Sequence, residues 1–350
     1  MKPRHFLSPL DWSSEELVSL AQTALTYKAC GRGRLLDAPD LSGQLMGLLF
    51  FNPSVRTRLS SEAAMARLGG QASALAAGTQ TWQFEDREGV TMDEDTQEHV
   101  KELGPVLSQI CDGIGIRKAE KMSGGSQAGQ AGASWEELSK DRFLHALADN
   151  AQVPVVNLES NAFHPCQGLA DMATLLELTG GKPQGKRYVL TWAWHPKALP
   201  VATPHSQLLA AADLGMRITV ARPEGYGLCP EVMGAAAARC AARGGSLEES
   251  ADPLGALDDA IVVCAKSWGR LDSYGLPVEQ ASPAADLRPD WRVDETKMAR
   301  TANAHFMHCL PIRRNVIATD GVLDSERCAV VQQAGNRLWS AVSIFARLLG

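Results

Sequence analysis

Paired cysteines, long apolar runs and excess positive charge are all missing from this 350-residue chain. Its eight cysteines include no C-x-x-C pair, which argues against a disulfide framework or a zinc knuckle. No apolar run is long enough to span a membrane, and the first seven residues lack the apolar core of a signal peptide. The net charge of −6 indicates no general surface for nucleic acid. We therefore expect a cytoplasmic protein without a membrane or nucleic-acid partner.

The chain has the composition of an ordinary globular protein, with 45% hydrophobic and 21% charged residues. Its length suggests two domains of about 150 residues each. Apolar strand-like segments alternate with helical segments in both halves, which predicts an α/β fold with two open parallel-sheet domains and an active site in the cleft between them. We expect a first domain over residues 1–152, a second over 153–333, and a terminal helix, 334–350, that packs back on the first.

The strongest local signal is the segment Leu45–Arg58. It opens with an apolar run typical of a strand buried in a parallel sheet, which Pro53 ends. Ser54 then caps a predicted helix. Because Arg56 and Arg58 join unpaired backbone N–H groups on the first turn of that helix, the turn is suited to bind a phosphate. The alternative is a simple serine cap with solvated arginines.

Other segments of the first half have less specific signals. Ser13 and Glu16 cap a predicted helix over Leu17–Cys30. A polar loop that carries Trp82 leads into a predicted helix, Thr96–Ile110. The Gly/Ser-rich piece Ser123–Ser134 is expected to be flexible.

Side chains suited to chemistry follow several predicted strands. The carboxyl ends of parallel strands meet at one edge of a sheet, where open α/β folds bind ligands. We therefore expect a single cleft to gather Ser54 to Arg58, Arg117, Glu159 to Gln167, His195, Lys266 and Cys309 to Arg313.

Three motifs, in chain order, resemble those of the aspartate and ornithine carbamoyltransferase family: Ser54-Val55-Arg56-Thr57-Arg58, His164-Pro165-Cys166-Gln167 and His308-Cys309-Leu310-Pro311. Each follows a predicted strand. Trp82 and the segments Thr191–Lys197 and Ala265–Trp268 resemble the branch of this family that acts on N-acylated ornithines. The resemblance extends over nearly the whole chain.

The resemblance implies a carbamoyltransferase of arginine biosynthesis that moves the carbamoyl group of carbamoyl phosphate to the δ-amine of an acylated ornithine. It implies no metal or organic cofactor. The residues implied to hold carbamoyl phosphate are Ser54, Val55, Arg56, Thr57, Arg117, His164, Gln167, Cys309, the Leu310 carbonyl and Arg337. Trp82 would enter the site of a neighbouring subunit, which implies a homotrimer.

Within that site, the resemblance gives separate roles to different groups. Arg117 would bridge the phosphate and the carbonyl oxygen, which His164 and Arg337 would polarise. Cys309 would orient or deprotonate the attacking amine. The residues implied to hold the acylated ornithine are Glu159, His195, Lys266, Arg313 and Gln97.

A metal site is the alternative for His305, His308 and Cys309. On a strand with a period of two, His308 and Cys309 face opposite ways, and no carboxylate is close in sequence. The pattern therefore argues against a metal.

The acyl group depends on Gln97, which stands where the succinylornithine enzymes of this branch have proline and the acetylornithine enzymes have glutamate. A neutral side chain removes the repulsion that glutamate would exert on a succinyl carboxylate. His164 follows Glu159 at the interval of five residues found in the succinyl subgroup, and Leu199–Pro204 resembles its proline-rich loop. Ile317 replaces a lysine of the acetylornithine enzymes. We therefore expect N2-succinyl-L-ornithine as acceptor and N-succinylcitrulline as product, with N2-acetyl-L-ornithine as the alternative.

Three other functions stay open at this point. A catalytically silent paralogue would keep the phosphate pocket and lose the amine side. A nicotinamide oxidoreductase would need the third glycine that is missing after Gly113-Ile114-Gly115. Plain ornithine is a further possible acceptor, although the tryptophan-bearing motifs belong to the acylated-substrate branch.

Overall fold

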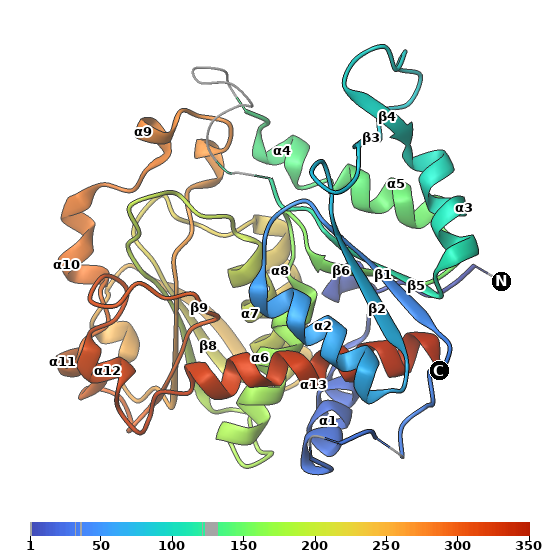
Figure 1. The fold of residues 1–350 in the computed structure, drawn as a ribbon. Coiled ribbons are helices and arrows are strands. Elements are labelled where there is room, and N and C mark those ends of the chain that lie inside the picture. The colour runs from blue at the N-terminus through green and yellow to red at the C-terminus, as the bar shows by residue number, and fades with distance from the viewer. Residues whose placement is uncertain (1, 32, 36, 121, 123–131) are drawn as a thin grey trace.

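Two parallel β-sheets form the framework of the chain (Figure 1). The computed structural model describes residues 2–31, 33–35, 37–120, 122 and 132–350, so residues 123–131 of the predicted flexible segment lie outside the described part. The first sheet has the order β2 (Gln71–Ala76), β1 (Leu45–Phe50), β5 (Gly113–Arg117) and β6 (Val155–Glu159). The second has the order β11 (His305–Met307), β10 (Val262–Lys266), β7 (Arg187–Trp192), β8 (Arg217–Ala221) and β9 (Ser246–Ser250). The predicted α/β class with two parallel sheets is confirmed.

The first sheet continues past the domain boundary that we expected at residue 152. Strand β6 pairs in parallel with β5, with Ile114 opposite Val155. The first sheet thus contains a strand that the boundary assigned to the second domain. The sequence predicts that this strand exists. It does not predict which strand it pairs with, because pairing joins distant residues and no local pattern encodes it.

Helices cover the sheets on both faces. They are α1 (Ser14–Ala29), α2 (Val55–Arg67), α3 (Val100–Ile110), α4 (Trp135–Leu138), α5 (Arg142–Asn150), α6 (Pro165–Leu178), α7 (Ala202–Asp213), α8 (Pro230–Ala242), α9 (Val278–Ala281), α10 (Arg288–Trp291), α11 (Glu295–Met298), α12 (Asp320–Leu323) and α13 (Val330–Leu349). The capping box predicted at Ser13 and Glu16 opens α1. Every described helix is too short or too polar to cross a lipid bilayer.

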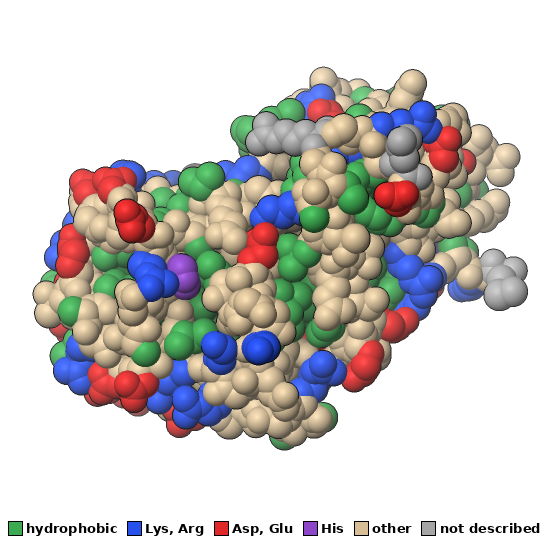
Figure 2. Space-filling view, turned by 90° about the horizontal axis from the view of Figure 1, so that it is seen from below, with side chains coloured by type: hydrophobic (Ala, Val, Ile, Leu, Met, Phe, Trp, Pro, Cys, Tyr) green, Lys and Arg blue, Asp and Glu red, His purple; other side chains and the backbone are tan. Residues whose placement is uncertain are grey.

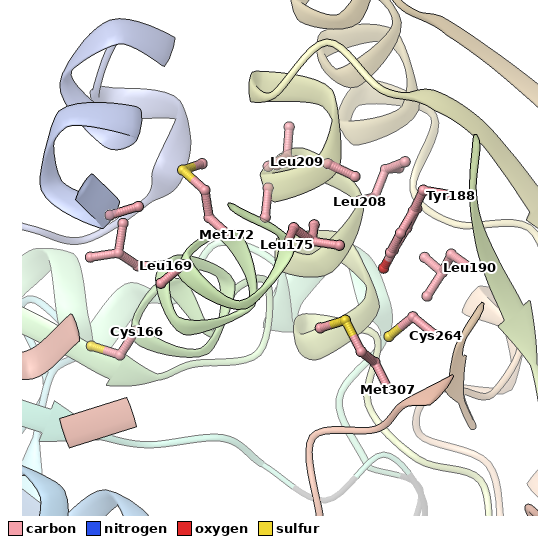
Figure 3. Packing of buried hydrophobic residues seen from close by; sticks show 14 of the residues in the cluster. Cys166, Leu169, Met172, Leu175, Tyr188, Leu190, Leu208, Leu209, Cys264 and Met307 are labelled. Atoms are coloured by element: carbon pink, nitrogen blue, oxygen red, sulfur yellow. The ribbon is translucent and has the colours of Figure 1, made fainter. Parts of the chain in front are cut away.

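The terminal helix and the central helix α6 join the two halves. Helix α13 runs beside α2 and also packs against α1 and α6 (Figure 1). Helix α6 is buried along Pro165–Leu176, and its apolar side chains meet those of α7 and the second sheet in one core (Figure 3). A helix buried on all sides can hold side chains rigidly at its ends, because close packing resists displacement.

A small arm projects from the first half. Its strands, β3 (Gln83–Glu85) and β4 (Thr96–His99), pair with each other and extend away from the body at the upper right of Figure 1. The prediction of a helix over Thr96–Ile110 is therefore wrong in its first four residues. The observed helix begins at Val100, and the His99 side chain caps it by accepting a hydrogen bond from the Lys101 N–H. Pairing with β3, a tertiary contact, overrides the local helical pattern.

Charges of both signs are interspersed over the face seen in Figure 2. This pattern agrees with the modest net charge of −6.

Candidate active site

A cavity of about 510 Å³ opens where the strand ends of both sheets face each other. Its wall includes most of the predicted site residues: Ser54, Arg56, Thr57, Arg117, Glu159, His164, Gln167, His195, Lys266, Cys309, Leu310, Arg313 and Arg337. A larger hollow of about 950 Å³ beside the arm shares none of these residues. The predicted convergence of strand ends at one cleft is thus present.

The first turn of α2 forms one side of the cavity. The Ser54 hydroxyl accepts a 3.3 Å hydrogen bond from the Thr57 N–H and caps the helix, as the sequence predicts. Val55 is 73% exposed and does not line the cavity, although it was predicted as a site residue. Arg56 reaches across to the other sheet and donates to the Leu310 carbonyl. Backbone N–H groups and a guanidinium therefore face the cavity together.

Arg117, at the end of β5, is held at the floor of the same cavity. One guanidinium nitrogen donates to the carbonyls of Asn52 and Pro53 at 3.0 and 3.1 Å. The other pairs with the carboxylate of Glu159. The chain thus fixes Arg117 beside the capped turn of α2.

Arg337 comes from α13 and connects two of the sequence motifs, the one at Thr57 and the one that contains His164 and Gln167. It is 5% exposed and donates to the Thr57 hydroxyl at 3.0 Å and to the Gln167 side-chain oxygen at 2.8 Å. The same nitrogen that binds Gln167 lies 3.4 Å from Nε2 of His164. Burial lowers the pKa of Arg337 from its usual value, although a guanidinium stays charged at neutral pH.

His164 is neutral at physiological pH. Its pKa lies well below the usual value because the imidazole is buried and because Arg337, Arg117 and Arg56 surround it with positive charge. Nε2 lies 3.6 Å from the Glu159 carboxylate, which does not offset those effects. A neutral imidazole keeps one ring proton that it can donate.

Three arginines of the cavity wall also carry a buried donor that lacks a partner among the described residues. The Nε atoms of Arg56, Arg117 and Arg337 are buried and have no hydrogen-bond acceptor within the described part of the chain. Burying such donors without an acceptor costs free energy. The Nε atoms of Arg187 and Arg292, away from the cavity, are likewise buried without an acceptor in the described part of the chain, so this feature alone does not mark an anion site.

The opposite wall comes from the second sheet. His195 and Lys266 are each 8% exposed, and the Lys266 ammonium donates to the Ser267 carbonyl at 3.1 Å. Nε2 of His195 accepts a 3.0 Å hydrogen bond from Arg313, which can only donate, so Nδ1 carries the ring proton and donates to the Lys197 carbonyl at 2.9 Å. The Lys197 N–H lies 3.1 Å from the same Nδ1, but a protonated nitrogen cannot accept from it. Burial lowers the pKa of His195 and keeps it neutral. This wall therefore offers two cations and a neutral imidazole.

The segment after β11 closes the cavity. The Leu310 N–H donates to Nδ1 of His308 at 3.0 Å, which holds the turn that aims the Leu310 carbonyl at Arg56. Burial raises the pKa of Cys309, so it is a thiol at neutral pH. Of the two roles implied for Cys309, this favours orientation of an amine over its deprotonation.

Comparison with known proteins decides the family. The model of the aspartate/ornithine carbamoyltransferase carbamoyl-P binding domain matches residues 4–177, and that of the Asp/Orn binding domain matches residues 201–348. The chain belongs to the aspartate/ornithine carbamoyltransferase family.

Relatives place this carbamoyltransferase in the N-acylornithine branch, as its motifs predict. It is 41% identical to the N-acetylornithine carbamoyltransferase of Xanthomonas campestris pv. campestris over 100% of this chain and 99% of the relative. It is 34% identical to the N-succinylornithine carbamoyltransferase of Bacteroides thetaiotaomicron over 86% of each chain. The crystal structure of an acetylornithine transcarbamylase complexed with acetylcitrulline matches with a TM-score of 0.91 and 41% identity over 99% of both chains.

Three predicted site residues, Val55, Trp82 and Gln97, do not line the cavity, and Arg58 of the predicted anion-binding turn is outside it as well. Trp82 is 51% exposed, and its indole N–H donates to Glu98 on β4 at 2.7 Å. Gln97 is exposed on the same strand. Both belong to the projecting arm, so neither can reach the cavity of its own chain in this conformation.

The cavity wall also includes residues to which we assigned no contact with a substrate, among them Thr203, His308 and Ile317. The motif around Cys309 already contained His308 as its first residue. No cluster of three or more His, Cys, Asp or Glu side chains in the described part of the chain could hold a metal ion.

Proposed function

We propose that this carbamoyltransferase transfers the carbamoyl group of carbamoyl phosphate to the δ-amine of N2-acetyl-L-ornithine, giving N-acetylcitrulline and phosphate, in arginine biosynthesis. The observation that carries the proposal is the meeting of Arg56, Arg117 and Arg337 at the capped start of α2, in a cavity whose other wall carries Lys266 and Arg313. A doubly negative donor fits the first wall, and the carboxylate of an acylated amino acid fits the second.

Carbamoyl phosphate would lie on the first wall. Its phosphate accepts from the backbone and side chains of residues 54–57, and Arg117 bridges phosphate and carbonyl oxygen. His164 is neutral, so its ring N–H can donate a hydrogen bond, without giving up the proton, to the same carbonyl oxygen next to Arg337. The carbamoyl NH2 donates to the Gln167 side-chain oxygen and to the Leu310 carbonyl.

The acyl acceptor would lie on the second wall, where the candidate contacts are Glu159, His195, Lys266 and Arg313. Its neutral δ-amine attacks the carbamoyl carbon, a C–N bond forms, and the carbonyl oxygen takes up negative charge. The Arg, Thr and His donors stabilise that oxyanion. The C–O bond to phosphate then breaks, and the amine proton leaves with the phosphate. Cys309, as a thiol, orients the amine.

The preference for acetyl corrects our prediction of succinyl. Similarity to the N-acetylornithine enzyme is higher, at 41% against 34%, and covers more of both chains. The argument from Gln97 was weak physically, because removing a repulsive carboxylate adds no positive charge for the succinyl group.

A homotrimer would complete each site. Trp82 is a large aromatic side chain next to the arm strand β3, and it is 51% exposed although its indole N–H is bonded to Glu98, so about half of its surface is available to a second subunit. We propose that the arm of one subunit carries Trp82, with Gln97 nearby, to the cavity of its neighbour.

Initial rates test the function directly. The enzyme is supplied with carbamoyl phosphate and with N2-acetyl-L-ornithine, N2-succinyl-L-ornithine or L-ornithine, and phosphate and the citrulline product are both measured. We expect kcat/KM for the acetyl compound to exceed the other two by about tenfold or more. A succinyl preference would restore our first prediction. Protection against melting by carbamoyl phosphate without turnover of any acceptor would indicate the silent paralogue.

A further inference from the structure

A buried carboxylate behind the cavity wall joins two of its components. Asp171 lies one helical turn after Gln167 on α6 and is 2% exposed. Its Oδ1 accepts a 2.7 Å hydrogen bond from the side-chain N–H of Gln167 and a 2.6 Å hydrogen bond from that of Gln333 on α13. Asp171 is not part of the cavity wall.

In both glutamines the side-chain N–H binds Asp171, and the side-chain oxygen accepts a hydrogen bond from a different donor. The Gln167 oxygen accepts from Arg337 at 2.8 Å, and the Gln333 oxygen accepts from the backbone N–H of His308 at 2.9 Å. A carboxylate only accepts hydrogen bonds and a guanidinium only donates them. Asp171 and Arg337 therefore fix the orientation of the Gln167 amide, with its NH2 group towards Asp171 and its oxygen towards Arg337. The same logic applies to Gln333 between Asp171 and His308.

We infer that Asp171 is a positioning residue for the transfer reaction: through Gln167 and Gln333 it sets the two carbonyl oxygens that receive the carbamoyl NH2. The inference rests on the proposed function, in which the Gln167 oxygen and the Leu310 carbonyl accept from that NH2. Through Gln333 and His308, Asp171 also holds the turn that presents Leu310.

The alternative amide orientation shows why this constraint matters. If the Gln167 amide rotated by half a turn, its NH2 group would face the Arg337 guanidinium and the carbamoyl NH2, which are all donors. If Gln333 rotated, its NH2 would face the His308 N–H, and the segment that carries Leu310 would lose its anchor. Either rotation would remove an acceptor for the carbamoyl NH2 and leave the phosphate contacts of α2 intact.

The role needs an acceptor at Oδ1 and does not need a negative charge. Burial raises the pKa of Asp171 to about 6, which reflects how poorly this site supports the charge. Asparagine can keep a carbonyl oxygen in the place of Oδ1, whereas leucine has similar size and no acceptor. The pair Asp171→Asn and Asp171→Leu therefore separates amide orientation from charge.

Steady-state kinetics with carbamoyl phosphate and N2-acetyl-L-ornithine test this. We expect Asp171→Leu to lower kcat about 30-fold or more, with KM for the acceptor nearly unchanged, because a misplaced reacting group costs rate rather than acceptor binding. Asp171→Asn should keep kcat within about threefold of the wild type. A matched control is Asp213→Asn, which changes a fully buried aspartate on α7 that binds Ser14 and Arg239, outside the cavity. It should lower the melting temperature without lowering kcat.

Ligand-dependent melting gives a second measurement that loss of structure alone would not mimic. Inorganic phosphate should protect the wild type and Asp171→Leu equally, whereas the additional protection by carbamoyl phosphate should be lost in Asp171→Leu. Equal losses of kcat in Asp171→Leu and Asp171→Asn would overturn the inference, as would a normal kcat in Asp171→Leu. If the Leu variant does not fold, a loss above about tenfold in Asp171→Asn overturns it. Failure of phosphate to protect the wild type would instead contradict the proposed function itself.

Discussion

Arg337 on the last helix donates a 3.0 Å hydrogen bond to the hydroxyl of Thr57 on the first turn of α2. The two residues are 280 positions apart, yet both side chains are buried in the same cavity wall. The C-terminal helix therefore contributes to the anion-binding turn itself, and its packing on α2 determines the geometry of the site.

Replacing Arg337 with lysine should lower kcat about 100-fold or more, because an ammonium cannot reproduce the two-pronged donation to Thr57 and Gln167. The measurement is phosphate release at saturating substrates. Arg347→Lys is the control, since Arg347 is exposed on the last turn of the same helix. Equal activities of the two variants would contradict a role for Arg337 in the site.

Arg56→Ala should reduce turnover about 1,000-fold and abolish protection against melting by inorganic phosphate. The melting temperature without ligand should change little, because the main role of the Arg56 side chain is to bind the charge of the ligand. Arg58→Ala is the matched control on the same helical turn: its side chain is 51% exposed and pairs with Glu62. Such an exposed ion pair contributes little to the stability of the fold. Phosphate protection that survives in Arg56→Ala would place the anion elsewhere.

Hybrid trimers test the exchange of Trp82 between subunits. Trp82→Ala and Arg56→Ala should each be inactive alone. After the two variants are unfolded and refolded together, about a quarter of the sites should combine an intact Arg56 with a Trp82 from the neighbour. Recovered activity that approaches this fraction supports a shared site, whereas a mixture as inactive as its components would leave the arm without that role.

Stability should fall as the pH falls from 6.5 towards 4, in part through His205. This residue is fully buried, Nδ1 donates to the Ala162 carbonyl at 3.0 Å, and Nε2 accepts from the Cys229 N–H at 3.2 Å. Burial lowers the pKa of His205 from 6.5 to about 4. The unfolded chain therefore binds a proton in this range that the folded chain excludes, and acid favours unfolding.

At pH 5 this residue should cost about 2 kcal/mol of stability relative to pH 7. Urea unfolding at both pH values measures the difference. His205→Gln should be less stable at pH 7 and should lose less on acidification, whereas His145→Gln, at an exposed position of α5, should behave like the wild type. An unchanged pH dependence in His205→Gln would show that other groups control acid unfolding.

Patterns with a short range could be predicted from the sequence alone. The strand β1, the serine cap and the arginines of α2 occupy adjacent positions, so their chemistry is visible within a few residues. The capping box of α1 is equally local. The presence of a basic anion turn in an acidic α/β protein, and the three motifs that resemble carbamoyltransferases, needed no tertiary information.

Tertiary structure alone decided which distant side chains meet. It assigned β6 to the first sheet, turned residues 96–99 into a strand of the arm, and placed Asp171 behind Gln167 and Gln333. Asp171 and Gln167 do stand four residues apart on a helix, which predicts that they face the same side, but Gln333, the other partner of Asp171, is 162 residues away from it. Strand pairing and buried polar contacts depend on the packing of the whole chain, so a local pattern can name the residues without saying which of them touch.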